Sequence, residues 1–214
     1  MSDLISCLCL TIPGREEFLK RAVACFHKQT YPNKQLVIVA DSACDKAGLN
    51  AAIAAHPGTA EYWIDERQLT IGAKRNLGCQ VARGEYIAIW DDDDYSSPRR
   101  LTEQYALLKE SGKDVTTLYR IYFTNADQSM WWLSDAGWID TSMMFKRSFW
   151  RAHPFGDKQI GAEGDFMREA VARHQLHIGG DSRWMFATNH PGNTADRACM
   201  YGPNNALKNF IWKD

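Results

Sequence analysis

The chain has 214 residues, of which 45% are hydrophobic and 24% charged, and its formal net charge is -1. This length is enough for one substantial hydrophobic core but short for two, so we expect a single domain over residues 1–214. Acidic and basic residues are interspersed, which argues against a polyanion-binding arm and against nucleic acid as a general electrostatic partner.

The six cysteines include no CxxC pair. Such usage is typical of reduced thiols in a cytosol rather than of a disulfide framework. The longest apolar stretch, residues 4–12, is far shorter than a membrane span. We therefore expect a cytoplasmic protein, and the pattern leaves peripheral attachment to a membrane open.

The first half alternates short apolar runs with helical patterns. The expected elements in chain order are a strand over residues 4–11, a helix over 15–28, strands over 35–40 and 62–65, a helix over 71–82 and a strand over 85–90. Strands that alternate with helices predict an α/β fold, with a mostly parallel sheet covered by helices on both faces.

The second half has weaker patterns. Residues 98–111 predict a helix with Pro98 in its first turn. Residues 115–123 and 130–133 predict two strands of a hairpin, which turns at residues 125–129. No repeat or long linker separates the halves, so we expect them to share one fold.

Four successive carboxylates, Asp91 to Asp94, directly follow the last strand expected in the first half. Their mutual repulsion at the end of a buried strand is costly unless a cation binds there. Ligands of open α/β sheets bind at the carboxyl ends of strands, and oxygen ligands suit Mg²⁺ or Mn²⁺, which also bind diphosphates. The alternative is a solvated acidic turn that only ends the strand.

An ordered set of short motifs surrounds this acidic cluster. QTYP follows the first helix, Asp41 closes the second strand, RNLG and ARGEYI occupy residues 75–78 and 82–87, and Pro98 follows the cluster. In this order and spacing the motifs resemble the nucleotide-binding half of family 2 glycosyltransferases, which have the GT-A fold and invert the anomeric centre. The resemblance implies a nucleotide-sugar-binding half over residues 1–110 and an acceptor-binding, catalytic half over residues 111–214.

The resemblance also implies roles on the donor side. The matching positions are Thr11, Arg15 and Asp41 at the nucleoside, and Lys74, Arg75 and Asn76, which approach the donor from the next helix. After its Thr the family usually has an aromatic residue and Asn, whereas this chain has Ile, Pro and Gly at residues 12–14. The nucleobase is therefore not identified by its stacking partner, and a UDP-sugar is the donor we expect.

Within the cluster the resemblance aligns Asp91 and Asp93 with the first and last carboxylates of the family's DxD motif. It implies that Asp93 binds a divalent metal, Mn²⁺ or Mg²⁺, while Asp91 and Asp92 hold the ribose or the donor sugar. Such a metal neutralises charge on the departing diphosphate. The alternative for any one of these side chains is a role at the surface or behind the ligands.

His190 lies in the segment TNHPGNT, which resembles a late loop of related transferases whose His completes the metal shell. Imidazole is an acceptable Mn²⁺ ligand beside carboxylate and phosphate oxygens. The alternative is an exposed histidine in a Pro-Gly turn.

Inversion also needs a base that accepts the proton of the attacking hydroxyl, and a carboxylate is the usual choice. The segment GAEGDFMR resembles the family's acidic motif at a helix start, where the base resides. Gly164 separates Glu163 from Asp165, so both are candidates. We favour Asp165 because it directly precedes the helical run FMREAV. The alternative for both carboxylates is capping of the helix.

The second half is rich in tryptophan, with Trp131, Trp132, Trp138, Trp150 and Trp184. Most are expected to be buried, and Trp138 and Trp132 are the candidates for a flat face under a sugar or a nucleobase. The acceptor stays open among a glycan, a lipid-linked saccharide, a protein, a metabolite and a modified nucleobase.

The sequence therefore predicts a metal-dependent, inverting glycosyltransferase that uses a nucleotide-diphosphate sugar. A nucleotidyltransferase acting on a sugar phosphate is the second choice, because TIPGREE lacks the glycine-rich basic loop of that class. A phosphohydrolase would carry its DxD after the first strand. The third reading is a nucleotide-sugar-binding protein without catalysis.

Overall fold

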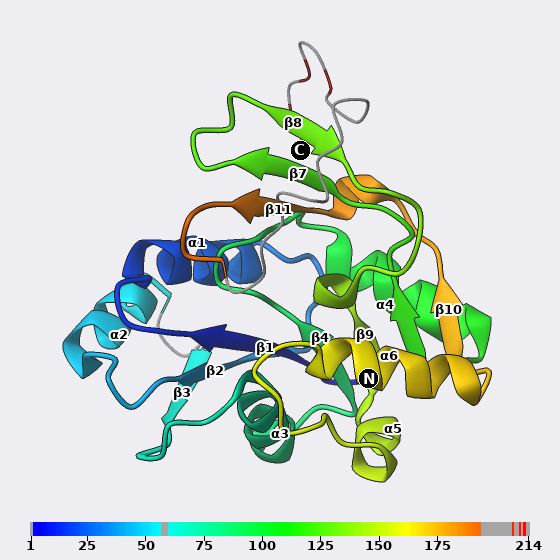
Figure 1. Ribbon diagram of the computed structural model, residues 1–214, viewed down its shortest axis with the longest axis horizontal. Coiled ribbons are helices and arrows are strands. Elements are labelled where there is room, and N and C mark those ends of the chain that lie inside the picture. Colours follow the sequence, from blue (N-terminus) through cyan, green and yellow to red (C-terminus); the bar gives the residue numbers. More distant parts are fainter. Residues whose placement is uncertain (1, 57–59, 194–206, 208–209, 211, 213–214) are drawn as a thin grey trace.

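A seven-stranded sheet lies at the centre of the computed structural model, which describes residues 2–56, 60–193, 207, 210 and 212 (Figure 1). Its strands are β1 (Ile5–Thr11), β2 (Lys34–Ala40), β3 (Ala60–Ile64), β4 (Tyr86–Ile89), β6 (Val115–Thr117), β9 (Met144–Lys146) and β10 (Leu176–Ile178). They are ordered β10-β6-β9-β4-β1-β2-β3, and only β9 runs antiparallel to its neighbours among these described strands. The predicted α/β fold with a mostly parallel sheet is confirmed.

Helices cover both faces of this sheet. The helices on one face are α1 (Glu16–His27), α2 (Lys46–Ile53) and α4 (Arg100–Ser111). Those on the other are α3 (Ile71–Val81), α5 (Arg147–Ala152) and α6 (Ala162–Ala172). Successive side chains of β1 point to opposite faces of the sheet. Cys7 packs in the core under the first group of helices and Leu8 in the core under the second group.

A second, four-stranded sheet lies beyond α1 and α4 (Figure 1). Its strands are β5 (Tyr95–Ser96), β7 (Tyr122–Asn125), β8 (Trp131–Leu133) and β11 (Met185–Asn189), in the order β5-β11-β7-β8. The predicted hairpin is present as the antiparallel pair β7 and β8. The single strand expected over residues 115–123 is wrong, because the chain leaves the main sheet after β6 and enters the second sheet at β7.

Two short 3-10 helices, η1 (Asp140–Ser142) and η2 (Ser182–Trp184), precede strands β9 and β11. No helix of the described residues has the length and apolar character needed to cross a membrane. Cys7, Cys9, Cys25, Cys44 and Cys79 are free thiols, and burial raises the pKa of the Cys7 thiol to about 12. The sixth cysteine, at position 199, lies outside the described residues.

Candidate active site

A cavity of about 950 Å³ opens where β1, β2 and β4 end. We call one side of it the N-terminal wall, which is formed by Thr11, Arg15, Asp41, Lys74, Arg75, Asp91, Asp92 and Asp93. The opposite side, the C-terminal wall, is formed by Phe123, residues 134–141, residues 159–161 and Glu163. The topology explains this meeting, because parallel strands present their carboxyl ends at one edge of the sheet.

The start of α1 and the end of β1 both hold Asp92. Its Oδ2 accepts a hydrogen bond from Thr11 Oγ1 at 2.7 Å, and its Oδ1 lies 2.8 Å from Arg15 Nη1. Burial raises the pKa of the Asp92 carboxyl to about 6, and the charge of Asp93 adds to the rise while Arg15 opposes it. Thr11 and Arg15, which the sequence placed at the nucleoside, therefore contact the acidic cluster in this structure.

Asp93 faces the loop that follows β11. Three nitrogens lie 3.1 Å from its Oδ2, namely Arg15 Nη1, His190 Nε2 and Asn193 Nδ2. The ring of His190 also stacks on Phe18 of α1, with 4.6 Å between centroids. His190 itself is not among the residues that line the cavity, but its ring nitrogen meets the carboxylate that does.

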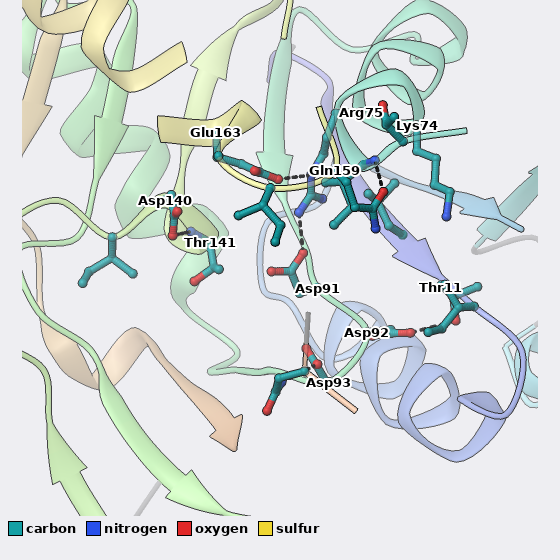
Figure 2. A pocket seen from close by; sticks show the side chains of 18 of the residues that line it. Thr11, Lys74, Arg75, Asp91, Asp92, Asp93, Asp140, Thr141, Gln159 and Glu163 are labelled. Atoms are coloured by element: carbon teal, nitrogen blue, oxygen red, sulfur yellow. Dashed lines mark hydrogen bonds and ion pairs between the residues drawn. The ribbon is translucent and has the colours of Figure 1, made fainter. Parts of the chain in front are cut away.

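Arg75 connects the two walls. Its Nη2 lies 2.7 Å from Asp91 Oδ1 and its Nε lies 3.1 Å from Glu163 Oε1. Figure 2 shows the guanidinium between these two carboxylates. The side chain is buried, and the two carboxylates raise its pKa against the effect of desolvation. Arg75 thus holds α6 against the end of β4.

The close approach of α3 to the segment before α6 depends on Gly72. Its N–H donates to the carbonyl of Lys158 at 3.0 Å, and a Cβ at this position would lie 1.8 Å from the carbonyl oxygen of Gly156. Only glycine allows this backbone contact. The contact sets the position from which Arg75 reaches Glu163.

Lys74 and Asp41 form an ion pair on the N-terminal wall. Asn76, by contrast, does not line the cavity. Its Oδ1 accepts hydrogen bonds from Trp150 Nε1 at 2.8 Å and from the Phe155 N–H at 3.0 Å. We therefore leave Asn76 out of the proposed donor site, since its amide holds the segment before α6.

Glu163 and Asp165 point to different surroundings. Glu163 lines the cavity, whereas Asp165 does not and instead forms ion pairs with Lys158 and Arg168. Hydrogen bonds from these two cations lower the pKa of the Asp165 carboxyl. The helix begins after Gly161 with no side-chain cap, so neither carboxylate is its N-cap.

The C-terminal wall contributes side chains that the sequence patterns did not single out. Asp140 and Thr141 line the cavity from η1, and Gln159 lines it from the segment before α6 (Figure 2). Asp135, which precedes η1, also lines it. Their local signal is weak, because they lie in irregular segments whose position depends on distant parts of the chain.

Of the two tryptophans expected to face a ligand, Trp138 lines the cavity and is 40% exposed. Trp132 is half-buried in β8 and does not line it. Trp131 and Trp184 are buried, as expected of core residues. Trp138 is thus the tryptophan that can contact a molecule in this cavity.

A divalent metal would find two ligands in this arrangement. The described residues contain no cluster of three or more His, Cys, Asp or Glu side chains that could hold a metal. The Asp93 carboxylate and His190 Nε2 nevertheless face each other at 3.1 Å. Two such donors fit Mg²⁺ or Mn²⁺ in a nucleotide site, where phosphate and water oxygens complete the coordination.

Curated relatives match part of the chain. It is 32% identical over 124 residues to the uncharacterized glycosyltransferase MJ1057 of Methanocaldococcus jannaschii, a match that covers 56% of this chain and 42% of the relative. It is 30% identical over 116 residues to the glycosyltransferase GlyG of Streptococcus pneumoniae, covering 54% and 38%. The matches thus cover less than half the length of these two relatives.

Solved structures share the fold at low identity. S. aureus TarS (residues 1–349) in complex with UDP superposes with a TM-score of 0.70 at 16% identity, covering 87% of this chain and 61% of that one. The mannosyltransferase PcManGT from Pyrobaculum calidifontis, in complex with GDP-Man and Mn²⁺, gives 0.66 at 14% identity, covering 88% and 57%. These neighbours confirm the GT-A fold. Because residues 7–167 match glycosyl transferase family 2, the chain belongs to that family.

Proposed function

We propose that this chain transfers a sugar from a nucleotide-diphosphate donor to an acceptor hydroxyl, with inversion at the anomeric carbon. The observation that carries the proposal is the bridge of Arg75 between Asp91 and Glu163. It brings Asp91 of the N-terminal wall and Glu163 of the C-terminal wall to one guanidinium at the edge of the same cavity. An inverting transfer needs groups that hold the leaving group and a base that reaches the attacking hydroxyl at the same anomeric carbon.

The N-terminal wall is the proposed donor site. Asp41 and Lys74 lie at the end of β2 and the start of α3, where the nucleoside would enter. Thr11, Arg15, Asp91 and Asp92 surround the place of the ribose and the diphosphate. The neighbours bind UDP, UDP-GlcNAc and GDP-Man, which supports a nucleotide sugar but leaves the base open. We expect a UDP-sugar.

A divalent metal, Mn²⁺ or Mg²⁺, fits beside Asp93 and His190. When bound, it would neutralise charge that develops on the departing diphosphate. The Mn²⁺ in the mannosyltransferase complex supports this assignment. The protein supplies only these two ligands, so the affinity for the metal should depend strongly on oxygens from the diphosphate.

Glu163 is the general base that the geometry favours over Asp165. Glu163 lines the cavity with its carboxylate near Arg75, whereas the carboxylate of Asp165 is held outside the cavity by Lys158 and Arg168. The base takes the acceptor proton as the hydroxyl oxygen attacks the anomeric carbon. A group outside the cavity cannot reach that proton.

The C-terminal wall is the proposed acceptor site, with Trp138 as a flat surface for a sugar ring. The side chain is 40% exposed and faces the cavity, so a ligand can cover it. Aromatic faces are common supports for such rings, since they bury apolar area without demanding a charge. The acceptor itself is still open among hydroxyl-bearing glycans, lipid-linked saccharides, proteins, metabolites and nucleobases.

A nucleotidyltransferase acting on a sugar phosphate and a nucleotide-sugar-binding protein without catalysis remain the rivals. Family membership weighs against the former, and the presence of Glu163 in the cavity weighs against the latter.

A panel of UDP- and GDP-sugars tests the proposal, with Mn²⁺-dependent thermal stabilisation and transfer to a mixed acceptor set as readouts. We expect one donor to stabilise the chain only with Mn²⁺ or Mg²⁺. Asp93→Asn should lose this stabilisation and reduce transfer by roughly 100- to 1,000-fold. His190→Ala should weaken metal-dependent donor binding with little change in melting temperature. Full turnover in excess chelator would contradict the metal, and formation of a nucleotide–sugar bond with release of pyrophosphate would support the rival.

A further inference from the structure

Arg15 supplies positive charge to the carboxylates proposed to hold the metal. Its Nη1 lies 2.8 Å from Asp92 Oδ1 and 3.1 Å from Asp93 Oδ2, and its Nη2 hydrogen-bonds the carbonyl of Gly192. The side chain is 14% exposed. One guanidinium thereby neutralises two adjacent acidic side chains and ties them to the loop after β11.

The carboxylate oxygen that would bind a metal is already surrounded. Arg15 Nη1, His190 Nε2 and Asn193 Nδ2 all lie 3.1 Å from Asp93 Oδ2. The Gly192 N–H donates to His190 Nδ1, so the neutral ring carries its proton on Nε2 and donates it to Asp93. His190 can turn from partner to ligand once that proton leaves Nε2, because the nitrogen then offers a lone pair to a cation. An Arg has no acceptor atom and keeps its charge, so beside this oxygen it repels a cation and competes with it for the carboxylate.

A diphosphate can replace the carboxylates as the partner of Arg15. The planar guanidinium binds phosphate oxygens through paired hydrogen bonds about as well as it binds carboxylates. Arg15 lines the same cavity as Asp91 and Asp93, so the diphosphate of a bound nucleotide would lie within the reach of the side chain.

The geometry points to Arg15 as the residue that couples metal binding to donor binding, an inference that rests on the proposed function. Without nucleotide, Arg15 occupies Asp93 in place of a cation and keeps the affinity for metal low. With nucleotide, Arg15 moves to the diphosphate, and Asp93 and His190 become free to bind the metal. The chain then takes up metal and donor together rather than metal alone.

Mn²⁺ binding to the full chain tests this coupling without any assay of transfer. The free Mn²⁺ signal in electron paramagnetic resonance gives the dissociation constant with and without UDP. Arg15→Met removes the charge and keeps much of the length of the side chain. The matched control is Lys20→Met, which removes an exposed cation that pairs with Glu17 on the same helix.

We expect Arg15→Met to bind Mn²⁺ at least about tenfold more tightly than the parent when no nucleotide is present. UDP should tighten Mn²⁺ binding strongly in the parent, and that factor should fall at least about tenfold in the variant. Lys20→Met should match the parent within about twofold in both arms, since an exposed ion pair has little effect.

Equal nucleotide-free affinity for Mn²⁺ in the parent and Arg15→Met would overturn the inference. If Arg15→Met melts early, Arg15→Lys serves instead, because it keeps the charge but not the paired geometry and should show a smaller gain in Mn²⁺ affinity. The nucleotide-free arm does not involve sugar transfer. A chain that shows the Arg15 effect but transfers no sugar would therefore contradict the proposed function alone.

Discussion

The two walls of the cavity are built differently. The N-terminal wall consists of residues at the ends of regular strands and the starts of helices, and each of its cations, Arg15, Lys74 and Arg75, is paired with a carboxylate. The C-terminal wall consists largely of the irregular segment 134–141 and presents the exposed ring of Trp138. The N-terminal wall thus presents paired charges on regular elements, whereas the C-terminal wall presents an aromatic face on a segment between two strands.

The largest effect should come from the carboxylate that the C-terminal wall contributes. Glu163→Gln keeps the shape and removes the proton acceptor, so transfer should fall by roughly 100- to 10,000-fold while the affinity for donor stays nearly constant. The turnover number measures the effect on transfer, and the dissociation constant of UDP measures the effect on donor affinity. Asp165→Asn is the matched control and should change turnover by less than about threefold, since its side chain lies outside the cavity. The reverse ranking would move the base to Asp165.

The buried charge of the N-terminal wall should appear in the pH dependence of stability. A pKa of about 6 for Asp92 means that the folded chain binds this proton more tightly than the unfolded chain, whose Asp pKa is about 3.9. Its contribution is complete below about pH 4 and is lost as the pH rises through about 6, a change of about 3 kcal/mol. Asp92→Asn should remove this fall from the curve of unfolding free energy against pH.

Urea unfolding of parent and variant at about pH 4 and about pH 7.5 measures that difference. Asp165 has a lowered pKa, so its contribution has the opposite sign and is lost as the pH falls. Asp165→Asn is therefore the control of opposite direction. Parallel pH curves for the parent and Asp92→Asn would contradict a buried carboxyl that prefers its neutral form.

The close approach of α3 to the segment before α6 can be broken at Gly72. A Cβ there would lie 1.8 Å from the carbonyl oxygen of Gly156, so Gly72→Ala should cost about 1–3 kcal/mol of unfolding free energy. Gly164→Ala is the control within α6, because its Cβ would meet only Arg168 at 3.5 Å. It should be neutral or stabilise the helix by up to about 1 kcal/mol. Urea melts compare the two, and an equal response would show that the close approach carries no constraint.

The smallest expected effect concerns the exposed ring. Trp138→Ala should raise the acceptor KM by roughly 5- to 20-fold through the loss of stacking, with little change in the donor KM. Trp138→Phe should recover part of the affinity. Initial rates at varied acceptor concentration separate these cases. A change confined to the donor KM would place Trp138 on the other side of the reaction.

Much of the main sheet could be predicted from the sequence. Strands β1, β2 and β4 are short apolar runs because both of their faces are buried, and α1 and α3 carry a helical period. Helix α2 has no such strong period, and its start is marked only by Asp45, which accepts a hydrogen bond from the Gly48 N–H. A helix with so weak a pattern cannot be distinguished from a loop by its sequence alone.

The break between β6 and β7 could not be predicted. Val115 and Phe123 are both buried, but in different cores, so the apolar run continues across the point where the chain changes sheets. Strands β9, β10 and β11 also escaped prediction, because short strands are defined by their partners rather than by their own residues.

The grouping of candidate residues could be predicted where topology decides it. Thr11, Asp41 and Asp91 to Asp93 lie at strand ends, and all of them line one cavity. Residues two positions apart on a helix point in nearly opposite directions, so only one of Glu163 and Asp165 could face the cavity. Which one does so depends on the packing of α6 against α3, and no local pattern reports that packing.

The reversed direction of β9 has a consequence for insertions and deletions. Because β9 runs opposite to β4, the segment 134–141 re-enters the sheet at the edge where the acidic cluster leaves it, with Met144 opposite Ala88 and the Ile89 N–H donating to the Met143 carbonyl at 2.9 Å. A two-residue slip of β9 would keep each side chain on its face but shift this segment by about 7 Å. A change of length inside β9 would therefore move the segment that carries Trp138 relative to the end of β4.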